Sequence, residues 1–504
     1  MNFIDNFLNK ITMYRLVLYY LIALVITAAL FGFFNILPYN PANVAFSTLL
    51  ILAISWLTQT VFVKGFGAIP NVESIYITGL ILALIITPVT PTDYAGVGFL
   101  IFASAWAMAS KYILAIGKKH IFNPAAFGVA LSALVIGKSA TWWIAGTVPL
   151  LPFIVLGGLL IVRKIHRFDL VLGFLITSLL TIALTANGGN YVNALTQTVL
   201  HSSIFFLAFV MLTEPLTMPP NRWLRIFYGM MVGFLFAPNI HISSFYFTPE
   251  LALLIGNVFV YIVSPKGRFT LSLLEKKELA DGTYEFVFTS DRPLLFRAGQ
   301  YLEWTLAHRF GDDRGNRRYF TIASSPTERV VRLGVKFYKP ASTWKRALWA
   351  MQPNDTLSAS QVAGDFVLPK DKNKKLVFIA GGIGVTPFRS MVQYLVDTKD
   401  TRVVTLLYSN KTASEIAYKE IFDSAAQTIG MKTVYALTNE PTPIPGTYSG
   451  MIDAALIMRE IPDYKERVFY ISGPHGMVEA FKKTLADMGI SRFNIKSDYF
   501  PGFA

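Results

Sequence analysis

Hydrophobic residues are distributed very unevenly along this chain. Up to about residue 264, apolar runs recur almost without pause, and most approach the roughly 20 residues that a helix needs to cross hydrocarbon. The pattern predicts ten spans, several of them short enough to be half-helices or re-entrant segments inside a bundle. The predicted spans lie near residues 15–37, 43–63, 71–88, 94–116, 122–137, 147–163, 169–186, 197–213, 223–237 and 248–264.

The pattern changes after residue 265. Over 266–370, short β-rich runs separated by Gly, Asn and Pro turns predict a small antiparallel β-barrel. Over 371–504, strands alternate with helices, which predicts a parallel sheet with crossover helices. The predicted fold class is therefore multi-domain: a polytopic α-helical membrane bundle over 1–265, then an antiparallel β-barrel domain, then an α/β domain.

Composition and charge support a membrane half. The chain is 53% hydrophobic with a net charge of +14, and its mean hydropathy of +0.47 is too high for a soluble protein of this size. If the loops alternate between two sides from a cytoplasmic N-terminus, one side collects all the Lys and Arg of this half except Lys138. Cytoplasmic loops are rich in these residues. We therefore expect an inner-membrane protein whose N-terminus and C-terminal half are cytoplasmic. No basic, aromatic-interleaved patch points to nucleic acid.

The types of redox centre are limited by residues that the chain lacks. It has no cysteine, which excludes disulfides, zinc–thiolate sites and cysteine-ligated iron–sulfur clusters. Of its six histidines only His201 lies near a predicted span, so the facing histidine pairs of a membrane haem are missing. Flavins and quinones remain as carriers, and no metal site is predicted.

Three motifs carry the chemistry of the C-terminal half. They are RRYFTIASSP at 317–326, LVFIAGGIGVTPF at 376–388 and YISGPHGM at 470–477. In this order and spacing they resemble the ferredoxin–NADP reductase family, in which electrons move between a nicotinamide nucleotide and a flavin. The resemblance implies that 266–370 binds FAD and that 371–504 binds NADH or NADPH.

The first motif implies contacts to FAD. Arg318, in the run Arg318-Tyr319-Phe320-Thr321, would bind the pyrophosphate, because guanidinium matches phosphate geometry. Phe320 would lie against the isoalloxazine, and the catalytic hydroxyl of Thr321 would reach the flavin N5 edge. Further expected FAD contacts are a second flavin strand at Val335, Lys336 and Phe337, an N-cap anion site at Ser342 and Thr343 before a helix over 344–351, and Phe500 over the flavin face.

The other two motifs imply contacts to the nucleotide. A glycine-rich turn between a strand and a helix lets the backbone approach a pyrophosphate, and proline suits the first helical turn. Ser472 stands where the family often has cysteine beside the nicotinamide, and we assign it a catalytic position. The remaining expected contacts are Gly381, Gly382, Gly384, Thr386, Pro387, Gly473, Pro474 and Met477. Lys411 could bind the 2′-phosphate of NADPH, but no Arg accompanies it. This favours NADH without deciding between the two nucleotides.

The membrane half has motifs of its own. ESIYITGLILALIITP at 73–88, KHIFNPAAFG at 119–128 and LTEPLTMPPNRW at 212–223 resemble membrane subunits of sodium-translocating NADH:quinone reductase and of the Rnf electron-transport complex. The resemblance covers roughly 30–264 and implies ten spans in two inverted repeats. The family commonly attaches FMN to a threonine, but 186–198 lacks that motif, so covalent FMN at Thr196 or Thr198 is not expected. Non-covalent FMN or riboflavin stays open.

Glu214 is the acid that we assign to the membrane step, because carboxylates in or near a bundle are costly and often functional. The predicted function is a membrane-bound flavoprotein oxidoreductase that passes electrons from NAD(P)H through FAD to a quinone or a membrane-bound flavin. Ion transport and further redox subunits are left open. Two alternatives remain: a transmembrane reductase for an extracytoplasmic acceptor, and a flavin or ion transporter with a regulatory nucleotide-binding domain.

Overall fold

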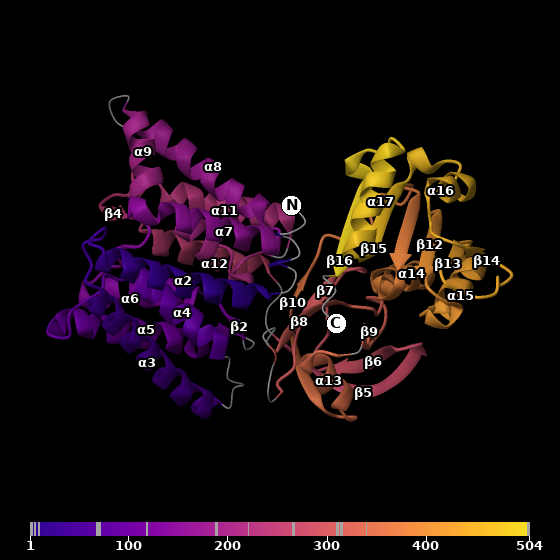
Figure 1. The fold of residues 1–504 in the computed structure, drawn as a ribbon, viewed down its shortest axis with the longest axis horizontal. Coiled ribbons are helices and arrows are strands. Elements are labelled where there is room, and N and C mark those ends of the chain that lie inside the picture. Colours follow the sequence, from indigo (N-terminus) through magenta and orange to yellow (C-terminus); the bar gives the residue numbers. More distant parts are fainter. Residues whose placement is uncertain are drawn as a thin grey trace. The chain divides into compact units, whose positions relative to one another are not determined.

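The computed structural model describes residues 4, 7–8, 11–66, 72–116, 119–186, 190–219, 221–264, 268–308, 312, 316–338 and 340–500, without the side chains of 119, 499 and 500. The chain divides into two compact units, Met1–Gly267 and Arg268–Ala504. The division lies two residues beyond the predicted boundary at 265. Figure 1 shows a helical first unit and a second unit built on two sheets.

The first unit is helical, and each predicted span coincides with helical structure. The helices are α2 (Met13–Phe33), α3 (Pro41–Phe66), α4 (Val72–Ile85), α5 (Tyr94–Ile113), α6 (Pro124–Ile136), α7 (Leu151–Ile165), α8 (Phe168–Thr185), α9 (Tyr191–His201), α10 (Ile204–Phe206), α11 (Arg222–Phe236) and α12 (Pro249–Val263). Two small hairpins join them, one from β1 (Ala115–Ile116) and β2 (Lys119–His120), the other from β3 (His241–Ile242) and β4 (Phe245–Tyr246).

Five helical segments in the described residues are long and apolar enough to cross a membrane. They are Met13–Phe33, Pro41–Phe66, Tyr94–Ile113, Val148–Ile165 and Phe168–Thr185. Tyr191–His201 and Ile204–Met211 would add a sixth span, although they are bent by 61° at their junction. Val72–Ile85, Pro124–Ile136 and Pro249–Val263 are apolar but shorter. The count of ten full spans therefore stays a prediction.

Polar contacts join helix ends that the sequence analysis assigns to the same side. Lys111 Nζ donates to Ser74 Oγ at 2.9 Å, and both residues belong to the predicted cytoplasmic side. On the opposite predicted side, Asn239 Nδ2 donates to the Thr185 carbonyl at 2.8 Å. The orientation of the spans and the placement of the unit in a membrane stay predictions.

The first sheet of the C-terminal unit is antiparallel and curled. Its strands are β5 (Phe269–Ala280), β6 (Thr283–Ser290), β7 (Tyr301–Thr305), β8 (Arg317–Thr321), β9 (Val331–Lys336) and β10 (Thr356–Ala363), in the order β8-β7-β10-β5-β6-β9. Helix α13 (Thr343–Ala350) packs on it through Trp344, which is fully buried with Trp304, Phe286 and Phe288. Strands β8 and β9 are the two ends of this order, so closure into a barrel stays a prediction.

The second sheet is parallel, as the alternation of strands and helices predicts. Its strands are β11 (Leu376–Gly381), β12 (Val404–Asn410), β13 (Lys432–Leu437), β14 (Thr447–Ser449), β15 (Val468–Pro474) and β16 (Ile495–Phe500), in the order β14-β13-β12-β11-β15-β16.

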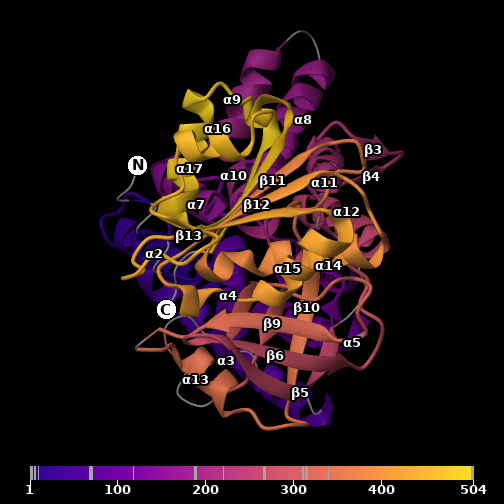
Figure 2. The same cartoon turned by 90° about the vertical axis from the view of Figure 1, so that its right-hand side faces the viewer.

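Helices cover both faces of the second sheet, as Figure 2 shows. Phe378 on β11 packs with α14 (Thr386–Asp397) and α15 (Lys419–Ile429). Its neighbour Ile379 packs with α16 (Ala454–Glu460) and α17 (His475–Asp487) on the opposite face. Successive residues of a strand point to opposite faces, so a central strand covered on both sides is apolar throughout. This explains the unbroken apolar run at 376–380.

The turn after β11 leaves no room for a side chain at Gly384. An added Cβ would lie 2.5 Å from Gly473 Cα and 2.6 Å from the Ser472 carbonyl oxygen, and backbone cannot move away cheaply. We expect Gly384→Ala to destabilise the C-terminal unit by about 1–3 kcal/mol, as overpacking does. Thermal unfolding of the full-length protein would measure this. Gly476→Ala in α17 is the control, since its Cβ would meet nothing within 4 Å. Equal melting temperatures for both variants would contradict the expectation.

Candidate functional site

The carboxyl ends of β11 and β15 form the switch point of the second sheet. These strands are parallel neighbours, with Ala380 opposite Ser472. From β11 the chain continues to β12 on one side, whereas from β15 it continues to β16 on the other. Open α/β sheets bind ligands in the crevice at such a point. The topology therefore places both nucleotide motifs, far apart in sequence, at one ligand-binding position.

The glycines at this point allow backbone segments to meet. Gly384 lies against Gly473, and an added Cβ at Gly381 would lie 2.2 Å from Met477 Sδ. Gly382 differs, because its φ is +52° and an added Cβ would meet nothing within 4 Å. A left-handed backbone facing open space favours glycine and leaves the N–H groups accessible to a ligand. The structure thus brings together Gly381, Gly384, Gly473 and Met477.

The residues that flank these glycines begin helices. Pro387 lies in the first turn of α14, as expected for proline. Pro474 precedes α17 and is exposed. Thr386 is 3% exposed, and its hydroxyl donates to the Ile383 carbonyl at 3.2 Å. Thr386 therefore caps the turn locally, and its side chain is buried.

The buried side-chain atoms without a hydrogen-bond partner in the described structure include two hydroxyls at this site. They belong to Thr321 at the end of β8 and Ser472 near the end of β15, which are 2% and 0% exposed. A buried hydroxyl without a hydrogen bond is costly, and most native ones are satisfied. These are the residues that the motifs assign to the flavin N5 edge and the nicotinamide. The residues present therefore fit both groups.

A second site for an anion lies at the N-terminus of α13. Asp312 Oδ1 accepts from Arg318 Nη2 at 3.3 Å, and its Oδ2 accepts from the Thr343 N–H at 3.1 Å. Ser342 is the N-cap of this helix and accepts from the Lys345 N–H. The Asp312 carboxylate thus makes the contacts expected of a phosphate oxygen. Asp312 thus joins Arg318 to Thr343, which follows the N-cap Ser342, and the contacts of these residues to FAD stay predictions.

Phe320 shares a face of β8 with Arg318, because strand residues alternate. The Phe320 ring is half-buried, and its centroid lies 5.2 Å from the centroid of the Trp344 ring. Phe320 therefore lies two residues along the strand from Arg318 at the anion site. Tyr319 points to the opposite face, where its hydroxyl donates to Glu303 Oε2 at 2.8 Å. A flavin lying on Phe320 would therefore meet Tyr319 only through its backbone.

The residues of the predicted second flavin strand make several contacts within the protein. Val335 is buried in the core of the first sheet. Lys336 pairs with Glu415 at 2.8 Å, and Phe337 packs edge-on against Trp349 with ring centroids 5.5 Å apart. The Phe500 backbone pairs with Pro474, but its side chain lies outside the described residues. The flavin contacts of these residues stay predictions.

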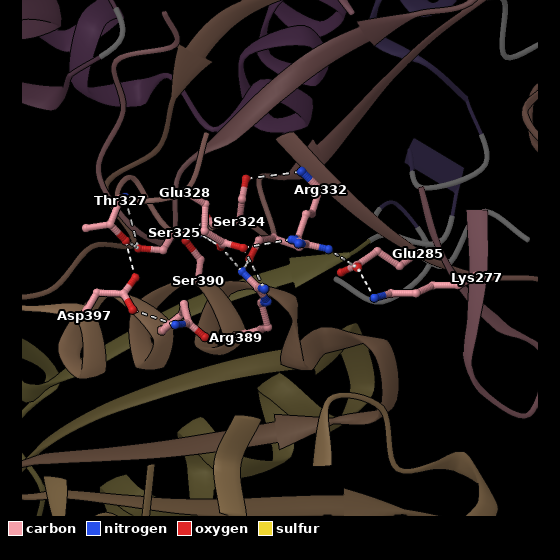
Figure 3. A network of polar contacts seen from close by, with 12 residues as sticks. Lys277, Glu285, Ser324, Ser325, Thr327, Glu328, Arg332, Arg389, Ser390 and Asp397 are labelled. Atoms are coloured by element: carbon pink, nitrogen blue, oxygen red, sulfur yellow. Dashed lines mark hydrogen bonds and ion pairs between the residues drawn. The ribbon is translucent and has the colours of Figure 1, made fainter. Parts of the chain in front are cut away.

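Sequence reasoning missed two acidic residues near the site, Asp312 and Glu328. The acidic pair that precedes Arg317 and Arg318 was a usable signal for Asp312. Glu328 belongs to the network in Figure 3. Burial by itself would raise the pKa of the Glu328 carboxyl, but the Arg389 guanidinium and hydrogen bonds from Ser325 and Arg332 outweigh it and hold the pKa below its usual value. Nothing in the sequence marks this pairing, since its partner Arg389 follows 61 residues later.

In the helical unit, two of the sequence motifs meet at Glu214. Its Oε2 accepts from Asn123 Nδ2 at 2.9 Å and from Thr217 Oγ1 at 3.2 Å, and its Oε1 lies 3.3 Å from His120 Nε2. Asn257 extends the cluster by accepting from the Asn123 N–H at 2.8 Å. Glu214 is therefore the centre of a polar cluster within the helical unit.

The threonines considered for covalent FMN bond to their own helix. The hydroxyls of Thr196 and Thr198 each donate to the carbonyl four residues earlier, at 2.8 Å. Residues 187–189 of the segment 186–198 lie outside the described residues. Both hydroxyls are thus hydrogen-bonded to helix backbone in this structure.

Comparisons with known proteins match the C-terminal unit. The profile of the oxidoreductase NAD-binding domain matches residues 378–483. One component of the Na(+)-translocating NADH-quinone reductase of Neisseria gonorrhoeae is 28% identical over 200 residues, covering 37% of this chain and 49% of that protein. The flavohemoprotein of Bacillus cereus is 27% identical over 200 residues, covering 38% and 50%. The chain thus spans about half the length of these curated relatives.

Among solved structures, the FAD/NAD-binding domain of a nitric oxide dioxygenase from Vibrio cholerae has a TM-score of 0.42 and 20% identity, covering 46% of this chain and 98% of that one. The resemblance of residues 30–264 to membrane redox proteins stays a prediction. The domain profile matches the second sheet, where the glycine-rich turn meets Gly473 at the switch point. The C-terminal unit of this chain is therefore an oxidoreductase module of the ferredoxin–NADP reductase-like family.

Proposed function

We propose that the protein is a membrane-bound flavoprotein oxidoreductase that passes electrons from NADH or NADPH, through FAD, to a quinone or a membrane-bound flavin. The observation that carries the flavin and nicotinamide part is the pair of buried hydroxyls at Thr321 and Ser472, which no described protein group satisfies. The family of the C-terminal unit supports the same cofactors.

Each protein group has a definite task in this proposal. Bound FAD supplies the hydride-accepting chemistry. Arg318 and the first turn of α13 would hold its pyrophosphate, and the Thr321 hydroxyl would donate to the N5 edge. The turn after Gly381 would bring backbone N–H groups to the pyrophosphate of the nucleotide, and Ser472 would orient the nicotinamide. Holding both partners in near-attack geometry supplies most of what a protein can add to such a reaction.

The helical unit would supply the acceptor site. We propose ten spans: the five long helices, the bent pair Tyr191–His201 and Ile204–Met211, and the short helices α4, α6, α11 and α12. A non-covalent FMN or riboflavin in this unit, ion transport and partner redox proteins remain compatible with the proposal. One curated relative is named for sodium translocation and quinone reduction, but those words describe that protein. Flavin content and NAD(P)H-dependent quinone reduction by the full-length protein in proteoliposomes test the whole proposal.

The first prediction concerns the anion site. Arg318→Ala should weaken FAD binding by about 1.5–3 kcal/mol, because it removes a charge-assisted contact to phosphate. FAD titration of the full-length apoprotein, followed by flavin fluorescence, measures this. Arg346→Ala is the matched control, since Arg346 lies on α13 and is exposed. Wild-type FAD affinity in Arg318→Ala would show that the motif residue does not hold the pyrophosphate.

The second prediction separates a cofactor contact from a structural role. Thr321→Val keeps the shape of the side chain but removes a hydroxyl that has no protein partner. We expect the apoprotein to be as stable as wild type or slightly more stable, because no hydrogen bond is lost. Reduction of the flavin by NAD(P)H, followed by stopped-flow absorbance, should be slower by about 10-fold or more. A loss of apoprotein stability with an unchanged reduction rate would assign Thr321 a structural role.

The third prediction concerns the membrane step. Glu214→Gln should leave NAD(P)H-to-dye activity intact, because Glu214 lies outside the reductase unit. We expect quinone reduction in proteoliposomes to fall, since a carboxylate among His120, Asn123 and Thr217 is suited to relay a proton or bind a cation. Glu73→Gln, a carboxylate at the start of α4, is the control. Unchanged quinone reduction in folded Glu214→Gln would leave this acid a structural role only.

A further inference from the structure

A network of buried charges joins the two sheets of the C-terminal unit. Glu328 lies in the loop after β8 of the first sheet, and Arg389 lies in the first turn of α14 on the second sheet. Arg389 Nη2 donates to Glu328 Oε1 at 3.0 Å, and its Nη1 donates to Oε2, so the contact is bidentate. Arg389 is only 4% exposed. A bidentate arginine–carboxylate pair in such a place has a defined geometry.

Two further hydrogen bonds tie the same helical turn to the same loop. Arg389 Nη1 donates to the Ala323 carbonyl at 3.1 Å, and Ser390 Oγ donates to the Ser324 carbonyl at 2.6 Å. At the other end of α14, Asp397 accepts from the Thr327 hydroxyl. The helix is therefore attached to the loop along its length, as Figure 3 shows.

The first sheet extends this attachment through its own charges. Arg332 Nε donates to Glu328 Oε1 at 2.8 Å, and Arg332 Nη1 donates to Glu285 Oε2 at 2.7 Å. Lys277 reaches Glu285 only at 3.7 Å and is half-exposed. The network thus begins at the rim of the first sheet and ends inside the contact between the sheets.

Gly334 on β9 makes room for the second sheet. An added Cβ there would lie 2.7 Å from the Tyr418 hydroxyl and 2.8 Å from Thr386 Cγ2. Tyr418 is buried, has a left-handed backbone with φ of +60°, and lies with its ring 5.9 Å from the Arg389 guanidinium. The turn that begins α14 is therefore seated against β9 as well as against the loop after β8.

The joined segments carry the two halves of the proposed reaction site. Thr321 precedes Ala323 by two residues, and the glycine-rich turn 381–384 runs directly into α14. Thr321 is thus two residues from Ala323, and Gly384 is five residues from Arg389. A misplacement of about 1 Å can slow a positioned reaction by on the order of 100-fold.

We propose that Glu328 is a positioning residue that sets, through Arg389 and alongside the hydrogen bond from Ser390 to the Ser324 carbonyl, the separation between the flavin-binding strand β8 and the nucleotide-binding turn. The proposal rests on the function proposed above, in which a hydride, meaning two electrons and one proton, passes from the nicotinamide to the flavin N5. Buried ion pairs add little net stability but leave a costly unpaired charge when one partner is removed. Loss of the Glu328 charge would let the Arg389 turn move away from the loop.

The experiment compares full-length wild type with Glu328→Gln, Ser390→Ala and the control Lys277→Met. FAD content and melting temperature are measured first, then the rate of flavin reduction at saturating NAD(P)H in single-turnover mode. Amide hydrogen exchange without nucleotide reports the attachment independently of activity. Lys277→Met changes the same network at its rim, within the first sheet, and should behave as wild type.

We expect Glu328→Gln to keep its FAD and its apparent affinity for NAD(P)H within about twofold, while flavin reduction slows by on the order of 10- to 100-fold. Ser390→Ala, which keeps every charge, should show a smaller decrease in the same direction. The rate of amide hydrogen exchange should rise at residues 323–328 and 386–391 in both Glu328→Gln and Ser390→Ala. A wild-type reduction rate in Glu328→Gln, or a decrease that only follows lost FAD, would overturn the positioning role. A wild type without FAD or NAD(P)H oxidation would instead overturn the proposed function, whereas exchange would still test the attachment.

Discussion

The close approach of Gly384 to Gly473 is the constraint on which the reductase unit depends. Two parallel neighbours, β11 and β15, end side by side, and the chain leaves them in opposite directions. Only glycine allows the turn after β11 to lie on the β15 backbone, since any Cβ at Gly384 would be about one bond length too close. That contact directs the start of α14. Arg389 and Ser390, which contact the loop after β8, follow at the end of this first turn.

The chemistry of the site follows from what the fold leaves unsatisfied. Most polar groups in a protein interior are hydrogen-bonded, and the hydroxyls of Thr321 and Ser472 are two of several exceptions in this unit, distinguished by their places in the sequence motifs. The anion site at α13 differs, because Asp312 satisfies its donors in the protein itself. A phosphate entering there would have to displace a carboxylate. Binding of FAD is therefore expected to rearrange the segment around Asp312, whereas the two hydroxyls are already in place.

Several polar side chains of the helical unit hydrogen-bond to one another. Glu214, Asn123 and Asn257 come from three segments of the chain and satisfy one another in an apolar surrounding. Such a cluster costs little only if every member finds a partner. A π-helical turn at Leu207–Met211 and the prolines that follow it interrupt the helical structure next to Glu214.

The sequence by itself determined the two-part organisation, the apolar helical runs, the parallel second sheet and the motif residues around the glycine-rich turn. These features depend on local periodicity and on residue types with strong backbone preferences, such as Gly384 and Pro387. The tertiary structure alone decided which groups pair across long separations. Glu328 and Arg389, or His120 and Glu214, are ordinary charged or polar residues in sequence, and only the packing of distant elements brings them within hydrogen-bonding distance. The tertiary structure also decided which hydroxyls have no hydrogen-bond partner, because hydrogen bonding depends on all the groups around a side chain and not on any one segment.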